Sequence, residues 1–369
     1  MAEHEPEILA RADKWLLIED FVNFMLCGRR VTDYSMASCT MLFDQRALGW
    51  SSEMVAAAGI DGRLLCEALP SGSVIGEVHR GAAEITGLEE GTPVVLGGHD
   101  LICGTLPVGA FRPASALDIT GTWESVVLST AEPLLDDRLR QAGMTVQAHV
   151  APGMYTAWGA SVAGEMLEWY RNELAGGAGS GKELDWAELM AEAEAAPHGA
   201  RGVMFLPHMS GSSCPVVDPK SLGAWLGLSP RATRGDLLRA VIEGLGYQFL
   251  DIVASMEAAM GGRLEKFIAV GGATRNRFWM QNKADILGRA IEVPEVEEAS
   301  PLGAAMLAGI GVGLYAGIEE ACSRVHRPGV VFQPDTRRAA DYARWFSIYQ
   351  QAYPATRPVS HALFEEFSG

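Results

Sequence analysis

The chain has few basic residues and no long apolar run, and each shortage excludes a class of protein. Its 369 residues carry 29 lysines and arginines against 46 acidic residues, for a formal net charge of −17. Nucleic acids and anionic membranes need clustered Lys and Arg, so neither partner is expected. No apolar run reaches bilayer length, and the acidic start MAEHEPEILARADKW is unlike a signal peptide. We therefore expect a cytoplasmic protein.

Cysteine and histidine are also sparse and scattered. The six cysteines form neither a C-x-x-C pair nor a regular framework, which favours a reducing compartment and small buried thiols. The eight histidines show no H-x-x-x-H spacing and no cluster with cysteine. A metal hydrolase therefore has little support, and no protein metal site is expected.

The length and the apolar pattern indicate two domains of different kinds. A chain of 369 residues exceeds what one core usually supports. Residues 1–90 show helical signals and loops, and strands mix with helices after that. The expected helices span 15–26, 51–58, 79–85, 161–174, 234–260, 278–288 and 301–315. The expected strands span 93–96, 117–122, 125–130, 145–150, 155–160, 264–272 and 290–294.

The strand expected at 93–96 has no expected partner among the first ninety residues. A lone strand leaves its backbone groups unpaired, so the first domain is expected to lack part of its sheet. Either the missing strands lie upstream of this chain, or the first hundred residues fold around the second domain. The first option is preferred.

One glycine-rich stretch imitates a phosphate-binding loop. GGAGSGKE at 176–183 matches G-x-x-x-x-G-K, but Glu183 stands where Ser or Thr would bind magnesium. The segment before it reads as a helix, whereas a P-loop follows a strand. A flexible linker over 175–181 is the better interpretation.

Two other stretches suit a nucleotide. In LDITGTWESVV (117–127), Thr120, Gly121 and Thr122 offer hydroxyls and N–H groups in a tight bend, although a plain hairpin turn is the better interpretation of this stretch alone. In AVGGATRNRFWMQNKADILG (269–288), a buried strand ends in Gly271-Gly272 just before a helix, whose N-terminus can bind phosphate. Asn276 could reach a purine edge, but an isolated Asn there more often caps the helix.

A carboxylate follows the buried strand at 93–96. In GTPVVLGGHDLICGTLPVGA (91–110), two glycines precede His99 and Asp100, and an apolar run follows. From these residues alone, Asp100 would cap a helix beginning at Leu101.

Taken together, four stretches in order resemble the FGGY family of carbohydrate kinases, which belongs to the actin-like group of two-domain phosphotransferases. They are WLLIEDFVNFMLCGRRVTDYSMASCTMLFD (15–44), TGLEEGTPVVLGGHD (86–100), FLPHMSGSSCPVVDPKSLGAWLGLS (205–229) and GGATRNRFWMQNKADILGRAIEVPEVEEASPLGAAMLAG (271–309). The resemblance covers about 15 to 320. It implies an α/β, actin-like (ribonuclease H-like) fold, with residues 1–108 in the N-terminal sugar-binding domain and 109–369 in the C-terminal nucleotide-binding domain.

The resemblance also implies an activity and a set of site residues. The activity is ATP-dependent phosphorylation of a sugar or polyol hydroxyl, with ATP and Mg²⁺ as cofactors. Asp100 matches the catalytic base, which accepts the proton of the attacking hydroxyl, and His99 lies with it at the sugar. Four glycine and threonine positions and one asparagine match the ATP site: Gly121, Thr122, Gly271, Gly272 and Asn276. Homodimers are common in the family, so a homodimer is a candidate assembly.

The chain departs from the family in several places. The D-x-G-T/S phosphate hairpin and the M-x-G-Q-like sugar segment are absent from the sequence, so the N-terminal domain is expected to be incomplete and turnover poor. Leu101 stands where several members place a polar residue, and Trp123 where a small one is common. A xylulose-type ketose is the first substrate to consider. The alternative is a non-catalytic nucleotide-binding fragment of such a kinase.

Overall fold

The computed structural model describes residues 4–175 and 185–367, so the P-loop-like stretch at 176–183 lies outside the described residues. The helices are α1 (Pro6–Arg11), α2 (Ile18–Cys27), α3 (Tyr34–Cys39), α4 (Ser52–Ala57), α5 (Arg80–Thr86), α6 (Asp100–Cys103), α7 (Asp137–Gln141), α8 (Gly164–Trp169), α9 (Trp186–Ala195), α10 (Arg234–Met260), α11 (Arg277–Leu287), α12 (Ala299–Gly311), α13 (Ile318–Val325) and α14 (Thr336–Phe367). Short helical turns lie at η1 (Gly62–Leu64), η2 (Tyr170–Leu174), η3 (Ala200–Gly202) and η4 (Gly272–Arg275).

The strands fall into one large sheet and four small ones. They are β1 (Val31–Asp33), β2 (Phe43–Asp44), β3 (Gly49–Trp50), β4 (Glu67–Leu69), β5 (Val74–Glu77), β6 (Pro93–Val95), β7 (Ser115–Thr120), β8 (Trp123–Thr130), β9 (Thr145–Ala148), β10 (Tyr155–Val162), β11 (Met204–Leu206), β12 (Ala224–Leu226), β13 (Lys266–Val270), β14 (Ile291–Val293) and β15 (Val330–Phe332).

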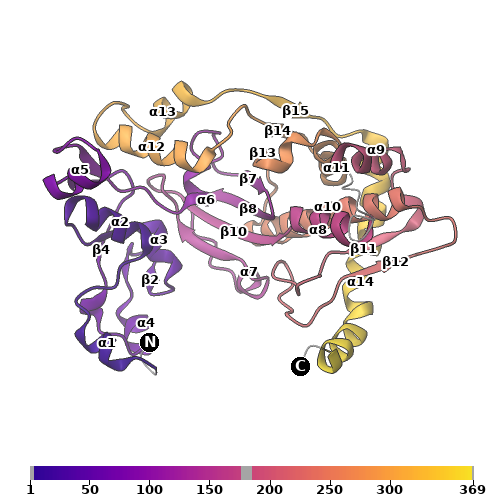
Figure 1. The fold of residues 1–369 in the computed structure, drawn as a ribbon, viewed down its shortest axis with the longest axis horizontal. Helices are drawn as coiled ribbons and strands as arrows, with labels where there is room; N and C mark the ends of the chain where they lie inside the picture. The colour runs from indigo at the N-terminus through magenta and orange to yellow at the C-terminus, as the bar shows by residue number, and fades with distance from the viewer. Residues whose placement is uncertain (1–3, 176–184, 368–369) are drawn as a thin grey trace.

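The N-terminal part contains short strands that the sequence did not predict. β6 pairs antiparallel with β5, β1 pairs parallel with β4, and β2 pairs with β3. The prediction of a lone strand at 93–96 is therefore wrong: residues 74–77 supply its partner across a bulge. This strand was missed because VIGE is too short, and its glycine too unfavourable for a strand, to give a pattern. In Figure 1 this part lies at one end of the molecule, beside the large sheet.

The predicted apolar face of the first helix is largely exposed. α2 keeps the expected helical spacing, but Ile18 has 78% of its surface exposed, and Phe21, Val22 and Met25 are about half exposed. Only the inner flank of the helix packs, through Leu26 and Cys27, against a small core that includes Val31.

The large sheet has seven strands in the order β15-β14-β13-β7-β8-β10-β9. β13 runs parallel to β7 and β14, and the other neighbours are antiparallel. Strands and helices mix along this part of the chain as expected, and the six strands predicted from the sequence after residue 116 are confirmed. The parallel pair β7 and β13 matters most, because its two carboxyl ends, Thr120 and Val270, meet at one edge.

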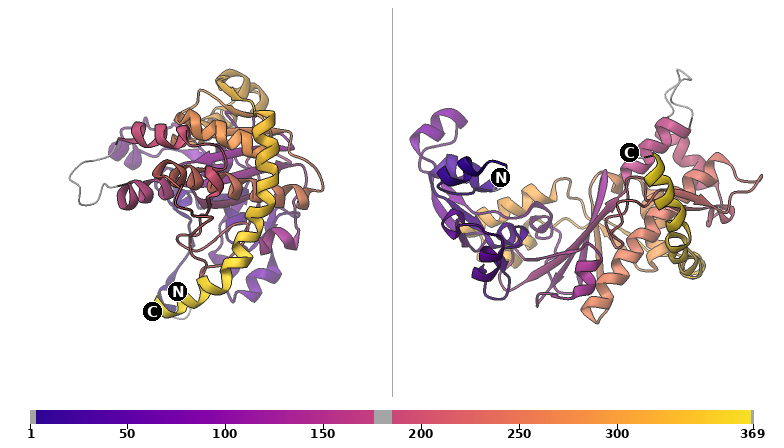
Figure 2. Two further views of the ribbon diagram at one scale, coloured as in Figure 1. Left: turned by 90° about the vertical axis from the view of Figure 1, so that its right-hand side faces the viewer. Right: turned by 90° about the horizontal axis from the view of Figure 1, so that it is seen from below.

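Long helices cover the sheet and bury its main core. α10 spans the 27 residues predicted, begins at a capping box formed by Thr233 and Asp236, and ends at Gly261 in a left-handed conformation. It packs with α11 and α9, so the core includes Phe249, Phe267 and Met280. Figure 2 shows these helices and α14 at the end of the molecule away from the N-terminal part.

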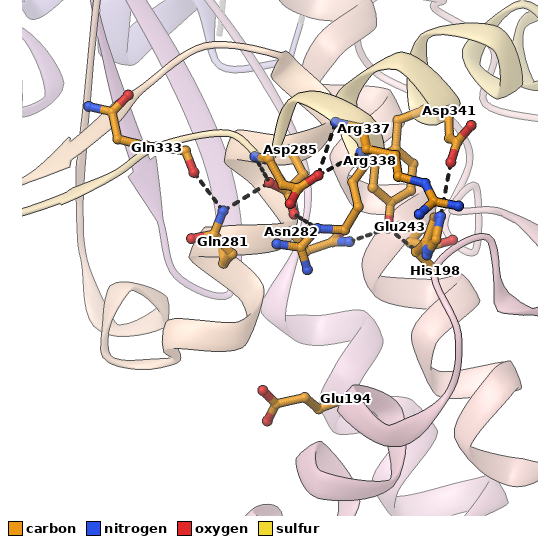
Figure 3. Close-up of polar contacts among 12 residues, drawn as sticks. Glu194, His198, Glu243, Gln281, Asn282, Asp285, Gln333, Arg337, Arg338 and Asp341 are labelled. Carbon is orange, nitrogen blue, oxygen red and sulfur yellow. Dashed lines mark hydrogen bonds and ion pairs between the residues drawn. The ribbon is translucent and has the colours of Figure 1, made fainter.

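The C-terminal helix α14 is held to α10 and α11 by buried polar contacts (Figure 3). Tyr342 donates a hydrogen bond of 2.7 Å to Glu243, which also pairs with Arg239, and the amide of Asn282 donates to the Tyr342 hydroxyl. On the next turn of α11, Asp285 pairs with Arg338 at 3.0 Å. Because Tyr342 and Arg338 of α14 bind partners on both α10 and α11, the network fixes the register of α14.

Helix α12 leads back to the N-terminal part and joins the two regions. It packs against α6 so closely that a side chain on Gly303 would overlap the Cys103 carbonyl. Figure 1 shows α12 and α13 lying over α6. This contact places the start of α6, and therefore Asp100, beside the edge of the large sheet.

The predictions about membranes and cysteines can be compared with the described part of the chain. None of its helices combines the length and the hydropathy of a membrane span. The six cysteines are free thiols, and four of them, Cys66, Cys103, Cys214 and Cys322, are buried as expected.

Candidate active site

Asp100 lies at the first turn of α6, directly after the strand and the glycines. Its side chain is 76% exposed, whereas that of His99 is 15% exposed, and His99 Nδ1 lies 3.0 Å from Asp100 Oδ1. His99 is itself the N-cap residue of α6, so Asp100 occupies the first helical position. An acidic group there is favoured by the helix dipole and remains open to a ligand.

The two side chains shift each other's protonation. Contact with His99 holds the pKa of Asp100 below its usual value, so the carboxylate is ionised at neutral pH. Burial alone would lower the pKa of His99, but Asp100 and Cys39 outweigh it and raise the pKa to about 9. The pair is therefore an imidazolium beside a carboxylate near pH 7. An exposed, ionised carboxylate can accept a proton from a hydroxyl group.

A buried hydrogen-bond network of Asp33, Ser35 and Ser71 holds the backbone of His99. The sequence analysis assigned these residues no role. The His99 backbone N–H donates to Ser35 Oγ at 2.9 Å, and Asp33 accepts bonds from the Ser35 hydroxyl and N–H and from Ser71. Asp33 ends β1 and caps α3. The T-D-x-S pattern at 32–35 was the available signal, since Asp before a short helix predicts a cap.

One glycine before the pair is required by packing. A Cβ atom on Gly98 would overlap Val150 and lie 2.8 Å from Ser35 Oγ. At Gly98 a residue without a side chain is therefore needed because protein atoms occupy the space.

The Thr120-Gly121-Thr122 turn joins β7 to β8 and is covered by the start of α8. Gly121 N–H bonds to the Trp123 carbonyl at 2.8 Å, which closes a tight turn. Gly164 N–H donates to Gly121 O at 3.0 Å, and a Cβ on Gly164 would lie 2.6 Å from that oxygen. Gly164 was missed, although its small size between a strand and a helix was a usable signal.

Gly271 and Gly272 follow β13 and behave differently. Gly271 has φ of 102°, and a Cβ there would lie 2.5 Å from the Thr120 carbonyl oxygen, so only glycine fits. A Cβ on Gly272 would meet no described heavy atom within 4 Å. Gly271 thus lets the ends of β13 and β7 touch, and Gly272 presents open backbone.

These two glycines line a cavity of about 680 Å³ at the carboxyl ends of the parallel strands. Its walls are Ile119, Val270, Gly271, Gly272, Thr274, Arg275, Pro294, Glu295, Val296, Glu297, Glu298, Ala299 and Ser300. Crevices at this end of parallel strands commonly hold ligands. Asn276 stands just beyond and caps α11, accepting a bond from Trp279 N–H at 3.0 Å.

The structure brings the predicted residues to one region through shared packing. Leu101, beside Asp100, packs on the same apolar cluster as Ile119, beside Thr120. The cluster also contains Val270 and Ala299, which line the cavity. This cluster therefore connects the elements that carry the predicted base and the two predicted nucleotide turns, while the residues that line the cavity itself lie between positions 119 and 300.

Comparison with known proteins shows the family of the chain. The FGGY family of carbohydrate kinases is matched by its N-terminal domain over residues 1–106 and by its C-terminal domain over 117–312. The chain belongs to this family. It is therefore a carbohydrate kinase, a phosphotransferase with an alcohol group as acceptor, and membership implies ATP as a substrate. The expectations of an actin-like two-domain fold and of a small-molecule sugar substrate are confirmed.

Individual relatives place the chain more closely within the family. A xylulose kinase of Lactococcus lactis subsp. lactis is 32% identical over 367 residues, which are 99% of this chain and 71% of the relative. An L-fuculokinase of Escherichia coli is 31% identical over 336 residues, 91% of this chain and 68% of the relative. The solved structure of a xylulose kinase from Rhodospirillum rubrum superposes with a TM-score of 0.86 at 31% identity, covering 97% of this chain and 71% of that one.

The family match gives no support to an incomplete N-terminal domain, because the N-terminal model matches residues 1–106. The expected incompleteness, the boundary between 108 and 109, and the individual site residues stay predictions.

Proposed function

We propose that this chain carries the machinery for ATP-dependent phosphorylation of a ketose of the xylulose type, with Asp100 as the general base. The observation that carries the proposal is the exposed, ionised carboxylate of Asp100, held beside the largely enclosed imidazolium of His99. As the sugar hydroxyl attacks the γ-phosphoryl group, Asp100 accepts its proton. His99 orients the carboxylate and lies where a sugar hydroxyl can reach it.

The nucleotide is proposed to bind along the edge of the large sheet. The Thr122 backbone N–H and hydroxyl face the β- and γ-phosphates beside Gly121, which has no side chain to block them, and the open backbone of Gly272 contacts the nucleoside, with Gly271 shaping the turn. Asn276 lies near the adenine while its side chain caps α11. Closure of the two parts around the ligand excludes water from the phosphoryl group.

Magnesium is proposed to arrive as the complex with ATP. No group of three or more His, Cys, Asp or Glu side chains in residues 4–175 and 185–367 is arranged to hold a metal ion. That fits Mg²⁺ in kinases, which is bound mainly by substrate phosphates and water with one or two carboxylates. The ion supplies charge neutralisation on the phosphates when bound.

Relatives support a ketose substrate, whereas Leu101 bears on which family members can serve as a guide to specificity. A xylulose kinase of Lactococcus lactis is 32% identical to this chain, and one of Staphylococcus epidermidis is 29% identical. Leu101, the residue after the base, is half-buried and apolar, and it offers no hydrogen bond to a sugar. The specificity of members with a polar residue there therefore does not transfer.

The proposal is tested by coupled ADP release with Mg-ATP and a panel of ketoses, aldoses and polyols. We expect sugar-dependent release that the Asp100→Asn variant loses. Glu90→Gln serves as a control, because Glu90 is an exposed carboxylate before the same strand and lies at its opposite end. Sugar-dependent release at an equal rate in Asp100→Asn would show that Asp100 is not the base.

Turnover by this chain alone is predicted to be poor, because the D-x-G-T/S hairpin is absent from its sequence. The assay is therefore run at high protein concentration and paired with calorimetric titration of MgADP. Binding of MgADP without sugar-dependent ADP release would favour the alternative, a non-catalytic nucleotide-binding fragment. Rapid turnover would contradict the predicted incompleteness.

A further inference from the structure

A fully buried lysine lies beneath the turn assigned to the phosphates. Lys283 is on α11, and its side chain is 1% exposed. Its ammonium donates to Asp118 Oδ2 at 2.6 Å and to Thr120 Oγ1 at 2.9 Å, and it also pairs with Glu124. All three protons of the ammonium are therefore used, as a buried charge requires.

The three partners of Lys283 flank the turn on both sides. Asp118 and Thr120 end β7, and Glu124 begins β8, so Gly121 and Thr122 lie between them. The Thr120 hydroxyl in turn donates to Asp118 Oδ1 at 2.6 Å. One ammonium group therefore ties together both arms of the hairpin that carries the turn.

The same lysine links the turn to the other two nucleotide elements. The Thr120 carbonyl is the atom against which Gly271 packs, so moving Thr120 moves the end of β13. Asn276 caps α11 seven residues before Lys283, which is two helical turns along the same face. Lys283 thus joins the β7–β8 turn to α11, and the Gly271 turn packs on the same Thr120.

Stability alone does not explain why this cluster is charged. A buried ion-pair cluster can often be replaced by apolar residues without loss of stability. Here the ammonium group bonds to residues on both sides of a short turn. The rings of Phe249 and Trp279 also lie over it, with centroids 4.9 and 5.9 Å from Nζ. No solvent is needed to satisfy the group, so its position is fixed by protein atoms alone.

We propose that Lys283 is a positioning residue for nucleotide binding: it sets the Thr120-Gly121-Thr122 turn against Gly271 and Asn276 through Asp118 and Glu124. This inference rests on the proposed function, because it assumes that these elements bind the nucleotide. It concerns geometry only, since Lys283 is enclosed and does not touch the ligand.

The test measures MgADP binding by calorimetric titration of the full chain. Lys283→Met is expected to weaken MgADP binding by about tenfold or more. This is about the change in affinity that corresponds to the loss of one hydrogen bond to a charged group, since the turn would no longer be held in its binding conformation. Arg289→Met is the control: Arg289 pairs with Glu257 near the start of β13, at the end opposite Gly271, and its partners do not include the turn. The control should bind MgADP as the wild type does.

Lys283→Met leaves two buried carboxylates unpaired and could fail to fold, so a neutral variant accompanies it. Lys283→Met/Asp118→Asn/Glu124→Gln removes all three charges while keeping the side-chain shapes. We expect it to fold, with a circular dichroism spectrum like that of the wild type, and still to bind MgADP about tenfold more weakly. A folded neutral variant with wild-type affinity would overturn the inference and leave the proposed function intact. Absence of MgADP binding by the wild type itself would overturn both.

Discussion

His99 Nδ1 lies 3.0 Å from Asp100 Oδ1, and the imidazole is enclosed while the carboxylate faces outward. The imidazole ring also lies against Trp158, with ring centroids 5.7 Å apart. This arrangement explains why an acidic residue can follow a buried strand. The Asp100 carboxylate pairs with the protonated His99 on its inner side and is solvated on its outer side.

This pairing predicts an unusual titration. The pKa of His99 is raised from 6.5 to about 9, so the stability contributed by its charge is fully present below pH 6.5 and is lost as pH rises through about 9. The pKa of Asp100 is lowered from 3.8, so its contribution is present above pH 3.8 and is lost as pH falls through the lower folded value. The pair is at full strength between about pH 4 and 6.5.

The titration is checked by following the His99 ring resonances by NMR against pH. We expect a midpoint near 9 in the wild type and a shift toward 6.5 in Asp100→Asn. His79 caps the exposed helix α5 and is a reference resonance within the same sample. An unchanged His99 midpoint in Asp100→Asn would show that the carboxylate does not hold the proton.

Gly271 and Gly272 should respond in opposite ways to alanine. Gly271→Ala places a Cβ 2.5 Å from the Thr120 carbonyl at φ of 102°, so we expect a loss of about 2–3 kcal/mol of unfolding free energy. Gly272→Ala meets open space among the described atoms and should change that free energy little, while weakening MgADP binding. Urea unfolding and titration of both variants distinguish the roles, and equal effects would contradict them.

The support beneath His99 should matter for stability. Asp33 accepts three hydrogen bonds from Ser35 and Ser71 and caps α3, so Asp33→Ala should cost about 2 kcal/mol of unfolding free energy. Ser51→Ala removes one cap from the surface helix α4 and should cost about 1 kcal/mol or less. Chemical denaturation of both variants gives the comparison. A smaller loss of unfolding free energy for Asp33→Ala than for Ser51→Ala would show that the hydrogen bonds of Asp33 do not stabilise the fold.

The buried contacts of α14 predict a large effect far from the site. Arg239→Met would leave Glu243 buried without its cation, and we expect a loss of about 3–5 kcal/mol (Figure 3). The exposed pair of Arg80 and Glu84 is the comparison, and Arg80→Met should leave thermal unfolding unchanged. Similar melting temperatures for Arg239→Met and the wild type would show that the buried pair of Arg239 and Glu243 does not stabilise the packing of α14.

The sequence by itself determined the elements that rest on local signals. α10 was predicted over 234–260 and both of its ends are confirmed, and the capping box at Thr233 and the glycine at 261 are local features that define them. β7, β8 and β10 were predicted because their apolar runs are separated by turn residues. The family motifs are likewise contiguous stretches, which is why the chain's family could be read before its fold.

Tertiary structure alone decided the contacts between distant segments. The pairing of β5 with β6 was missed because short strands acquire their conformation from a partner. Gly98 had to be glycine because Val150, far along the chain, occupies the space beside it. Lys283 has the sequence context of a surface helix residue, yet it is buried because Asp118 and Glu124, about 160 residues earlier, converge on it. A local pattern records the preferences of neighbouring residues, whereas burial and pairing depend on which segments the fold brings together.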